Sequence, residues 1–129
     1  MTPKLRLSAA RRLKRNNDFI RVRRNGKTYR CRYFALFSTI RAANSADFSS
    51  ARIGISASKR VGNAVARNRV KRRFRELFRK WQFEIRLDAD IVISSRLPAI
   101  DADPEDLEQR FLHAIQYNGL RRSPTKPTT

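Results

Sequence analysis

The sequence predicts a single α+β domain, built as an α/β sandwich with helices on one face of a sheet. Alternating hydrophobic residues, which are typical of strands, occupy 29–40, 52–58 and 90–95, and patterns of helical period precede, separate and follow them. The strand at 52–58, the helix after it and the strand at 90–95 form a βαβ unit, which leaves the other face of the sheet partly free. A length of 129 residues suits one domain with a modest core.

The N-terminal part of the domain is predicted as one short helix followed by a long strand region. Residues 16–18 are Asn, Asn and Asp, which favour a helix N-terminus, and Gly26 stands where a helix often ends in a left-handed residue. The region 29–40 is long enough to be a bent pair of strands. In one continuous strand, Tyr29 and Phe37 would share a face because they have the same parity.

The segment 59–80 is the most distinctive part of the chain, because it contains ten Lys or Arg residues and a single acid, Glu76. A helix that begins near Gly62 or Asn63 has a stripe of hydrophobic residues at core-facing spacing. The stripe consists of Val70, Phe74, Leu77, Phe78 and Trp81. Cations occupy the far side and one flank. An ordinary solvated helix face usually pairs its cations with Glu four residues away, so that alternative is the weaker one.

The C-terminal part is predicted as a short buried strand at 91–93 and a final helix. Asp103 and Pro104 supply an N-cap and a first-turn proline for that helix. The acids between 101 and 108 are explained by capping and by the helix dipole, and a metal site is the weaker alternative. The tail after Gly119 is predicted to be disordered.

Charge limits the possible partners of the chain. A formal net charge of +19 and an isoelectric point near 11.7 indicate a polyanionic partner, with nucleic acid favoured. No apolar run reaches the roughly 18 residues that a membrane span needs, so a membrane partner is disfavoured. Cys31 is the only cysteine, which excludes an internal disulfide and indicates a reducing compartment. Residues 1–10 are predicted to form a flexible basic arm.

Residues for catalysis by the protein itself are scarce. His113 is the only histidine, so a zinc site or a Ser-His-Asp arrangement lacks partners. We therefore predict no catalytic residue and no metal ligand in the protein. A nuclease that works without a partner is accordingly disfavoured.

The basic segment carries a motif of cations, amides and one glycine at fixed spacing: Lys59-Arg60-x-Gly62-Asn63-Ala64-x-x-Arg67-Asn68-Arg69-x-Lys71-Arg72. It resembles the RNR signature of the protein subunit of bacterial ribonuclease P. Further pieces of the family pattern lie in the same order: Leu13-Lys14-x-x-x-Asp18-Phe19, Gly26, Tyr33-Phe34, Gly54-Ile55-Ser56-x-Ser58-Lys59 and Asp90-Ile91-Val92-Ile93. The resemblance covers roughly residues 11–116.

The resemblance implies the fold and the role of the whole chain. The implied domain spans 11–118, with αβββαβα order, a mostly antiparallel sheet and one βαβ crossover, similar to the second domain of a small-subunit ribosomal protein. A disordered tail at 119–129 would follow. The implied role is that of accessory subunit in a bacterial, cytoplasmic ribozyme that removes the 5′ leader of precursor tRNA, with one protein per RNA. The chemistry would belong to the RNA subunit, through Mg²⁺ ions held by that RNA and the substrate.

The resemblance also implies two sets of binding residues. Those facing the RNA subunit would be Lys59, Arg60, Asn63, Arg67, Asn68, Arg69, Lys71, Arg72, Arg73 and Arg75. Those lining a cleft for the leader, between the first helix and the open sheet face, would be Phe19, Val22, Arg23 and Phe37. Arg23 stands where several family members have an aromatic residue, and its guanidinium can stack on a base or contact phosphate instead.

Some alternatives remain open from the sequence. Composition alone also favours a ribosomal or other RNA-binding protein with no link to catalysis. Phe19 and Phe37 fit ordinary core packing, since a short helix on a sheet needs such residues. Asn63 and Asn68 fit a cap or a turn as well as an RNA contact.

Overall fold

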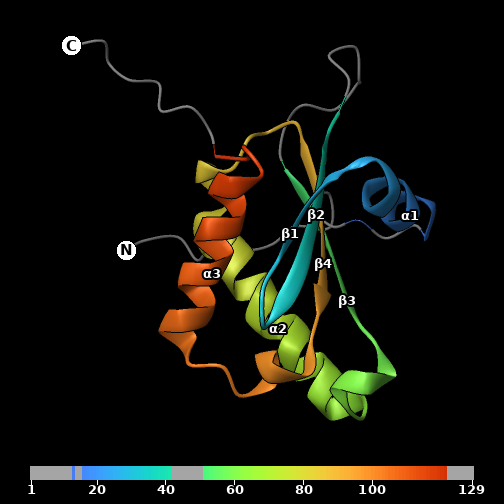
Figure 1. Ribbon diagram of the computed structural model, residues 1–129, viewed down its shortest axis with the longest axis vertical. Coiled ribbons are helices and arrows are strands. Elements are labelled where there is room, and N and C mark those ends of the chain that lie inside the picture. The colour runs from blue at the N-terminus through green and yellow to red at the C-terminus, as the bar shows by residue number, and fades with distance from the viewer. Residues whose placement is uncertain (1–12, 14–15, 42–50, 122–129) are drawn as a thin grey trace, which may run out of the picture.

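Three helices and one four-stranded sheet make up the fold in the computed structural model, which describes residue 13, residues 16–41 and residues 51–121 (Figure 1). The elements are α1 (Asn16–Asn25), β1 (Lys27–Arg30), β2 (Phe34–Ile40), β3 (Arg52–Ala57), α2 (Ala64–Trp81), β4 (Ala89–Ser95) and α3 (Pro104–Tyr117). Short 3-10 turns lie at Lys59–Val61, Gln82–Glu84 and Leu97–Ile100. The αβββαβα order implied by the family resemblance is confirmed.

The sheet has the strand order β1-β2-β4-β3. β1 pairs with β2 and β2 pairs with β4 in antiparallel fashion, whereas β3 and β4 run parallel and are joined through α2. A parallel pair needs a long crossover, and a helix is its usual form. The mostly antiparallel sheet with one basic crossover helix is therefore confirmed.

The region 29–40 is a hairpin, not one continuous strand. Its register pairs Tyr29 with Leu36 and Thr28 with Phe37, and residues paired across antiparallel strands share a face. Tyr29 therefore faces the same side as Leu36, and Phe37 faces the opposite side. The expectation that Tyr29 and Phe37 share a face is wrong, because the chain reverses at residues 31–33 and resets the alternation.

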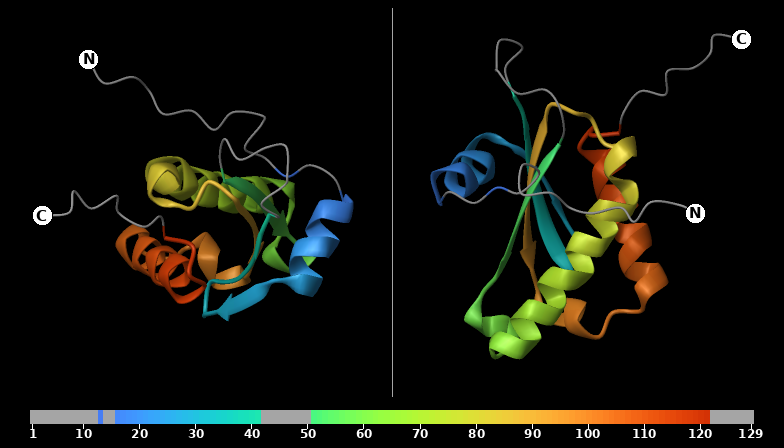
Figure 2. Two further views of the ribbon diagram at one scale, coloured as in Figure 1. Left: turned by 90° about the horizontal axis from the view of Figure 1, so that it is seen from above. Right: turned by 180° about the vertical axis from the view of Figure 1, so that it is seen from behind.

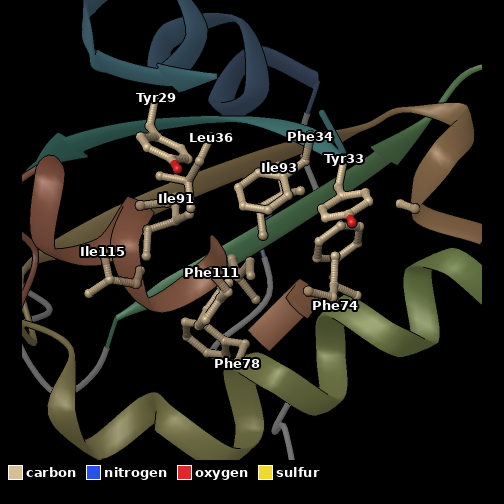
Figure 3. Packing of buried hydrophobic residues seen from close by; sticks show 14 of the residues in the cluster. Tyr29, Tyr33, Phe34, Leu36, Phe74, Phe78, Ile91, Ile93, Phe111 and Ile115 are labelled. Carbon is tan, nitrogen blue, oxygen red and sulfur yellow. The ribbon is translucent and has the colours of Figure 1, made fainter. Parts of the chain in front are cut away.

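Helices cover both faces of the sheet. Figures 1 and 2 show α2 and α3 on one face and α1 on the other, where it covers part of the face predicted to be free. The larger core lies between the sheet and the α2–α3 layer (Figure 3). Phe34 from β2 meets Phe74 from α2 edge to face there, with ring centroids 5.4 Å apart.

A smaller hydrophobic cluster holds α1 on the sheet. Val22 of α1 is fully buried against Phe37 of β2 and Val92 of β4. Phe19 packs beside them, over Gly54 of β3. A Cβ atom on Gly54 would lie 2.5 Å from Phe19 Cζ, so the absent side chain makes room for the ring.

Local capping sets the starts of α2 and α3. Asn63 caps α2, because its Oδ1 accepts a hydrogen bond from Ala66 N at 3.0 Å. Gly62, just before the cap, has a φ of +142°, which disfavours any residue with a side chain. Asp103 caps α3 through Asp106 N, and Pro104 occupies the first turn as predicted.

The ordered domain extends beyond the predicted boundary at residue 118. Leu120 is buried, and its carbonyl accepts a hydrogen bond from Arg86 N at 2.8 Å. Arg121 forms an isolated antiparallel bridge with Ile85. The prediction of disorder is wrong for residues 119–121, since Leu120 completes the core at the end of α3. The rest of the predicted tail, and the arm at 1–10, lie outside the described residues.

Candidate nucleic-acid interface

Helix α2 turns its hydrophobic stripe inward and its cations outward. Val70, Phe74 and Phe78 are fully buried in the larger core, and Leu77 and Trp81 are partly buried against it. The predicted stripe is therefore confirmed. Because these side chains fix the rotation of the helix, the motif cations of the opposite side stay at the surface.

Most of the predicted RNA-contacting residues lie exposed along the first turns of α2 and just before it. The exposed ones are Lys59, Arg60, Asn63, Asn68, Arg69, Arg72 and Arg75, and the half-buried ones are Arg67, Lys71 and Arg73. The residues from Lys59 to Arg69 lie where α2 begins, near the bottom of Figure 1, and those from Lys71 to Arg75 continue along the helix beyond its middle. RNA contact by these residues stays a prediction.

The start of α2 adds a second source of positive potential. Its first turn contains no acid, and the helix N-terminus carries the positive end of the dipole. Lys59 and Arg60 lie in the 3-10 turn directly before it, which Ser58 caps by accepting a hydrogen bond from Arg60 N. Backbone N–H groups and side-chain cations at a helix N-terminus together favour phosphate groups.

Arg73 differs from the other motif cations because its guanidinium is used inside the fold. Nη1 donates to the carbonyl oxygens of Ala99 at 2.8 Å and Ile100 at 2.9 Å, and Nη2 donates to that of Ala102. These bonds tie α2 to the segment between β4 and α3. An arginine on a helix flank cannot be assigned this role from sequence, because the carbonyls belong to a segment about 26 to 29 residues away.

The predicted leader residues do not form an open aromatic cleft in this structure. Val22 is 0% exposed and Phe37 is 7% exposed, so both act as core between α1 and the sheet. Arg23 is exposed and holds its guanidinium 5.3 Å from the centroid of the Phe37 ring, and that of Arg30 lies at 5.9 Å. The surface above Phe37 is therefore cationic, and burial favours the core-packing alternative for Phe37 itself. The leader role of these residues stays a prediction.

One charged cluster was missed by the sequence reasoning. Asp90 of β4 is fully buried and accepts hydrogen bonds from three guanidinium groups: Arg21 at 2.7 Å, Arg41 at 2.6 Å and Arg52 at 2.8 Å from both Nε and Nη2. Burial acts to raise the pKa of Asp90, but the bonds from Arg52, Arg21 and Arg41 outweigh it and hold the pKa below its ordinary value. An acid inside an apolar strand was the only sequence signal.

Catalytic and metal-binding groups do not gather in the part of the chain that the structure describes. Residues 16–41 and 51–121 contain no group of three or more His, Cys, Asp or Glu side chains placed to hold a metal ion. His113 is exposed, and its Nδ1 lies 2.9 Å from the Tyr29 hydroxyl. Across the described ranges, no helix is both long and apolar enough to span a bilayer.

The sheet order, the basic crossover helix and the exposed cations define a small α+β protein with a surface suited to polyanions. The family model for ribonuclease P matches residues 7–118. The chain is 36% identical over 114 residues to the ribonuclease P protein component of Listeria monocytogenes, covering 88% of this chain and 92% of that one. It is also 36% identical over 110 residues to the ribonuclease P protein component of Staphylococcus epidermidis, and that match covers 85% of this chain and 91% of the other.

Solved structures agree with the sequence comparisons. The ribonuclease P protein of Staphylococcus aureus superimposes with a TM-score of 0.73 and 31% identity, covering 87% of this chain and 98% of that one. The ribonuclease P protein of Thermotoga maritima superimposes with a TM-score of 0.69 and 27% identity, and the match covers 82% of this chain and 96% of that one. The chain belongs to the ribonuclease P protein family. The resemblance carried by the motif is thus confirmed.

Proposed function

We propose that the chain is the protein subunit of a bacterial ribonuclease P holoenzyme, acting in the cytoplasm with one protein per RNA. It binds the catalytic RNA and the 5′ leader of precursor tRNA, and it assists removal of that leader. The observation that supports this most strongly is the match to the family over 112 residues, from 7 to 118, together with the motif cations exposed at one end of α2.

The RNA subunit is the proposed partner of the basic end of α2. Lys59, Arg60 and Arg69 are exposed, and the first turn of α2 has no acid that would repel phosphate. Each cation that neutralises a phosphate releases counterions, so the affinity depends strongly on salt. A rigid helix suits this task, because Val70 and Phe74 hold its rotation while the cations remain at the surface.

The leader of precursor tRNA is proposed to cross the side of the sheet that α1 partly covers. Arg23 and Arg30, over the Phe37 ring, offer guanidinium planes to phosphates and bases of a single strand. Because Phe37 itself is nearly buried, the contact would be more electrostatic than aromatic. Cleavage releases the leader, and the tRNA side of the broken bond becomes the mature 5′ end, which carries the phosphate.

Hydrolysis is assigned to the RNA subunit. Mg²⁺ ions held by that RNA and by the substrate would activate water for the attack on the phosphodiester bond. The protein contributes binding and positioning.

Reconstitution tests this assignment. Purified protein, ribonuclease P RNA and precursor tRNA are combined at a low Mg²⁺ concentration, and the release of the leader is followed. We expect cleavage only when protein and RNA are both present. Cleavage by the RNA-free recombinant protein, or no gain when the protein joins the RNA, would overturn the assignment.

A matched pair of variants separates specific binding from general charge. Arg69→Ala removes an exposed cation of the motif, whereas Arg121→Ala removes an exposed cation beyond the other end of α2, whose side chain pairs with Glu84 at 3.5 Å. Both variants lose one positive charge. Only the first is expected to weaken assembly with the RNA subunit.

A further inference from the structure

An aromatic cluster on the α3 side of the sheet belongs to neither of the RNA-binding surfaces proposed above. The ring centroid of Tyr29, in β1, lies 5.2 Å from that of His113 and 5.5 Å from that of Tyr117, both in α3. The centroids of His113 and Tyr117 are 6.4 Å apart. The Tyr29 hydroxyl also lies 2.9 Å from His113 Nδ1. We call these three residues the α3 aromatic patch.

Two of the three rings in the patch are open to solvent. Tyr29 is its buried floor, at 7% exposed, whereas His113 is exposed and Tyr117 is 66% exposed. The contacts with Tyr29 and His113 restrict the position of the Tyr117 ring. An aromatic ring that is both exposed and held by its neighbours offers a hydrophobic face for stacking. The patch therefore presents such a face before any partner binds.

The surface around the patch is positive. The two segments that supply it, 27–36 and 109–121, contain five Lys or Arg residues and no acid. Lys27 and Arg110 are both exposed. Lys27 lies on the same face of β1 as Tyr29, two residues along the strand, and Arg110 lies within hydrogen-bonding reach of the Tyr29 hydroxyl. Aromatic rings among cations are typical of surfaces that bind single-stranded nucleic acid.

Strand β1 separates the patch from the surface proposed for the leader. It is the outermost strand, and β2 is its one partner strand among the residues that the structure describes. Figures 1 and 2 show β1 between α1 and α3. Arg30 turns to the α1 side, where it lies over Phe37, and its neighbour Tyr29 turns to the α3 side. An RNA strand that crosses the edge of β1 therefore passes from one surface to the other.

We propose that the α3 aromatic patch binds the distal part of a long precursor-tRNA leader, meaning the part farther from the cleavage site. A base stacks on Tyr117 beside His113, and the exposed cations Lys27 and Arg110 attract the phosphates of the backbone. This contact rests on the proposed function, since it requires a holoenzyme that binds a leader. Stacking is tolerant of sequence, so the patch recognises the length of the leader and not particular bases.

Leader length separates the patch from the surface around Arg23 and Arg30. The reconstituted holoenzyme is titrated with two precursor tRNAs, whose leaders have about 4 and about 16 nucleotides, the range that single-strand sites span. We expect the longer leader to bind more tightly. Tyr117→Ala should weaken binding of the long-leader precursor about tenfold, as loss of one stacked base predicts, and should leave binding of the short-leader precursor unchanged.

Matched variants and a crosslink locate the contact. Tyr117→Phe keeps the ring and should keep the affinity for the long leader. Phe83→Ala removes a ring that is 51% exposed in the turn after α2, outside the patch, and should change the affinity for neither precursor. Lys27→Ala should make binding of the long leader less sensitive to salt. A photoreactive 4-thiouridine at the 5′ end of the long leader should crosslink to the part of α3 that contains His113 and Tyr117.

Three results would overturn the proposal: no loss of long-leader affinity in Tyr117→Ala, the same loss for both leader lengths, or crosslinks confined to other parts of the protein. A lower mass of the free protein in solution after Tyr117→Ala would instead assign the patch to contact between copies of the chain. Cleavage of both precursors without any effect of leader length would contradict the role of the patch alone. Failure to cleave either precursor would contradict the proposed function, and the role of the patch with it.

Discussion

Arg21 of α1 donates a hydrogen bond from Nη2 to Asp90 Oδ2 of β4 at 2.7 Å, and this ion pair ties the first helix to the centre of the sheet. Arg41, which follows β2, and Arg52, at the start of β3, bind the same carboxylate. One buried acid therefore joins four separate parts of the chain.

Asp90→Asn is expected to lower the free energy of unfolding by about 3–5 kcal/mol, because it removes the buried negative charge to which Arg21, Arg41 and Arg52 all donate hydrogen bonds. Denaturant unfolding measures the change. Asp88→Asn breaks the partly exposed pair with Arg86 and should cost less than about 1 kcal/mol. Equal losses in the two variants would contradict a special role for the buried carboxylate.

Acid should weaken the fold through Asp90. Because its pKa is held below the ordinary 3.8, the folded state binds fewer protons than the unfolded state in that range. The contribution is complete above the ordinary pKa and is lost as the pH falls through the lower, folded pKa. We expect the unfolding free energy to fall as the pH drops below the ordinary pKa of 3.8, and to fall less steeply in Asp90→Asn. The same slope in both proteins would assign the acid sensitivity to other groups.

Arg72 and Arg73 are neighbours in the motif but should respond differently to removal. Arg72 is exposed and its removal should cost one phosphate contact. Arg72→Ala should therefore lower the salt slope, the slope of log affinity for RNA against log salt concentration, by about one. It should change the free energy of unfolding by less than about 0.5 kcal/mol. Arg73→Ala leaves carbonyls of the segment after β4 without donors and should cost about 1–3 kcal/mol of stability. A stable Arg73→Ala protein with a lowered salt slope would return Arg73 to the RNA contacts.

The packing of Phe19 on Gly54 predicts a coupled pair of mutations. Gly54→Ala places a methyl group 2.5 Å from the present position of Phe19 Cζ, so the ring must move and stability should fall by about 1–3 kcal/mol. In a Phe19→Ala background, Gly54→Ala should cost little, and the double-mutant cycle measures the difference. If the losses in unfolding free energy from the two single mutations added up in the double mutant, the two side chains would not be in steric conflict.

Leader recognition should depend on the cations above Phe37. Arg23→Ala is expected to weaken binding of precursor tRNA by the holoenzyme about fivefold, with mature tRNA unaffected, because only the precursor has a leader. Arg24→Ala is the control, since Arg24 is an exposed neighbour on the same helix. Phe37→Leu keeps most of the buried volume, so it tests the ring without emptying the core. If Phe37→Leu weakened the binding of precursor and mature tRNA equally, Phe37 would have a packing role only.

Local patterns were sufficient to predict most elements of this fold, although they did not decide that the region 29–40 is a hairpin of two strands. Asn63, Asp103 and Pro104 act at helix ends within a few residues of their own position, so their roles follow from the adjacent sequence. The stripe from Val70 to Trp81 likewise reports the face of α2 that packs on the sheet. The motif spacing was enough to predict the family.

The roles of several charged and aromatic residues required the tertiary structure. Asp90 meets arginines that are 38 to 69 residues away, so no sequence window could pair them. The same holds for Arg73, whose carbonyl partners are supplied by another segment, and for Phe37, whose burial depends on α1. Leu120 lies beyond the last helix and packs only because the chain turns back there. Periodicity decides which face a residue occupies within its own element, whereas long-range packing decides what that face meets.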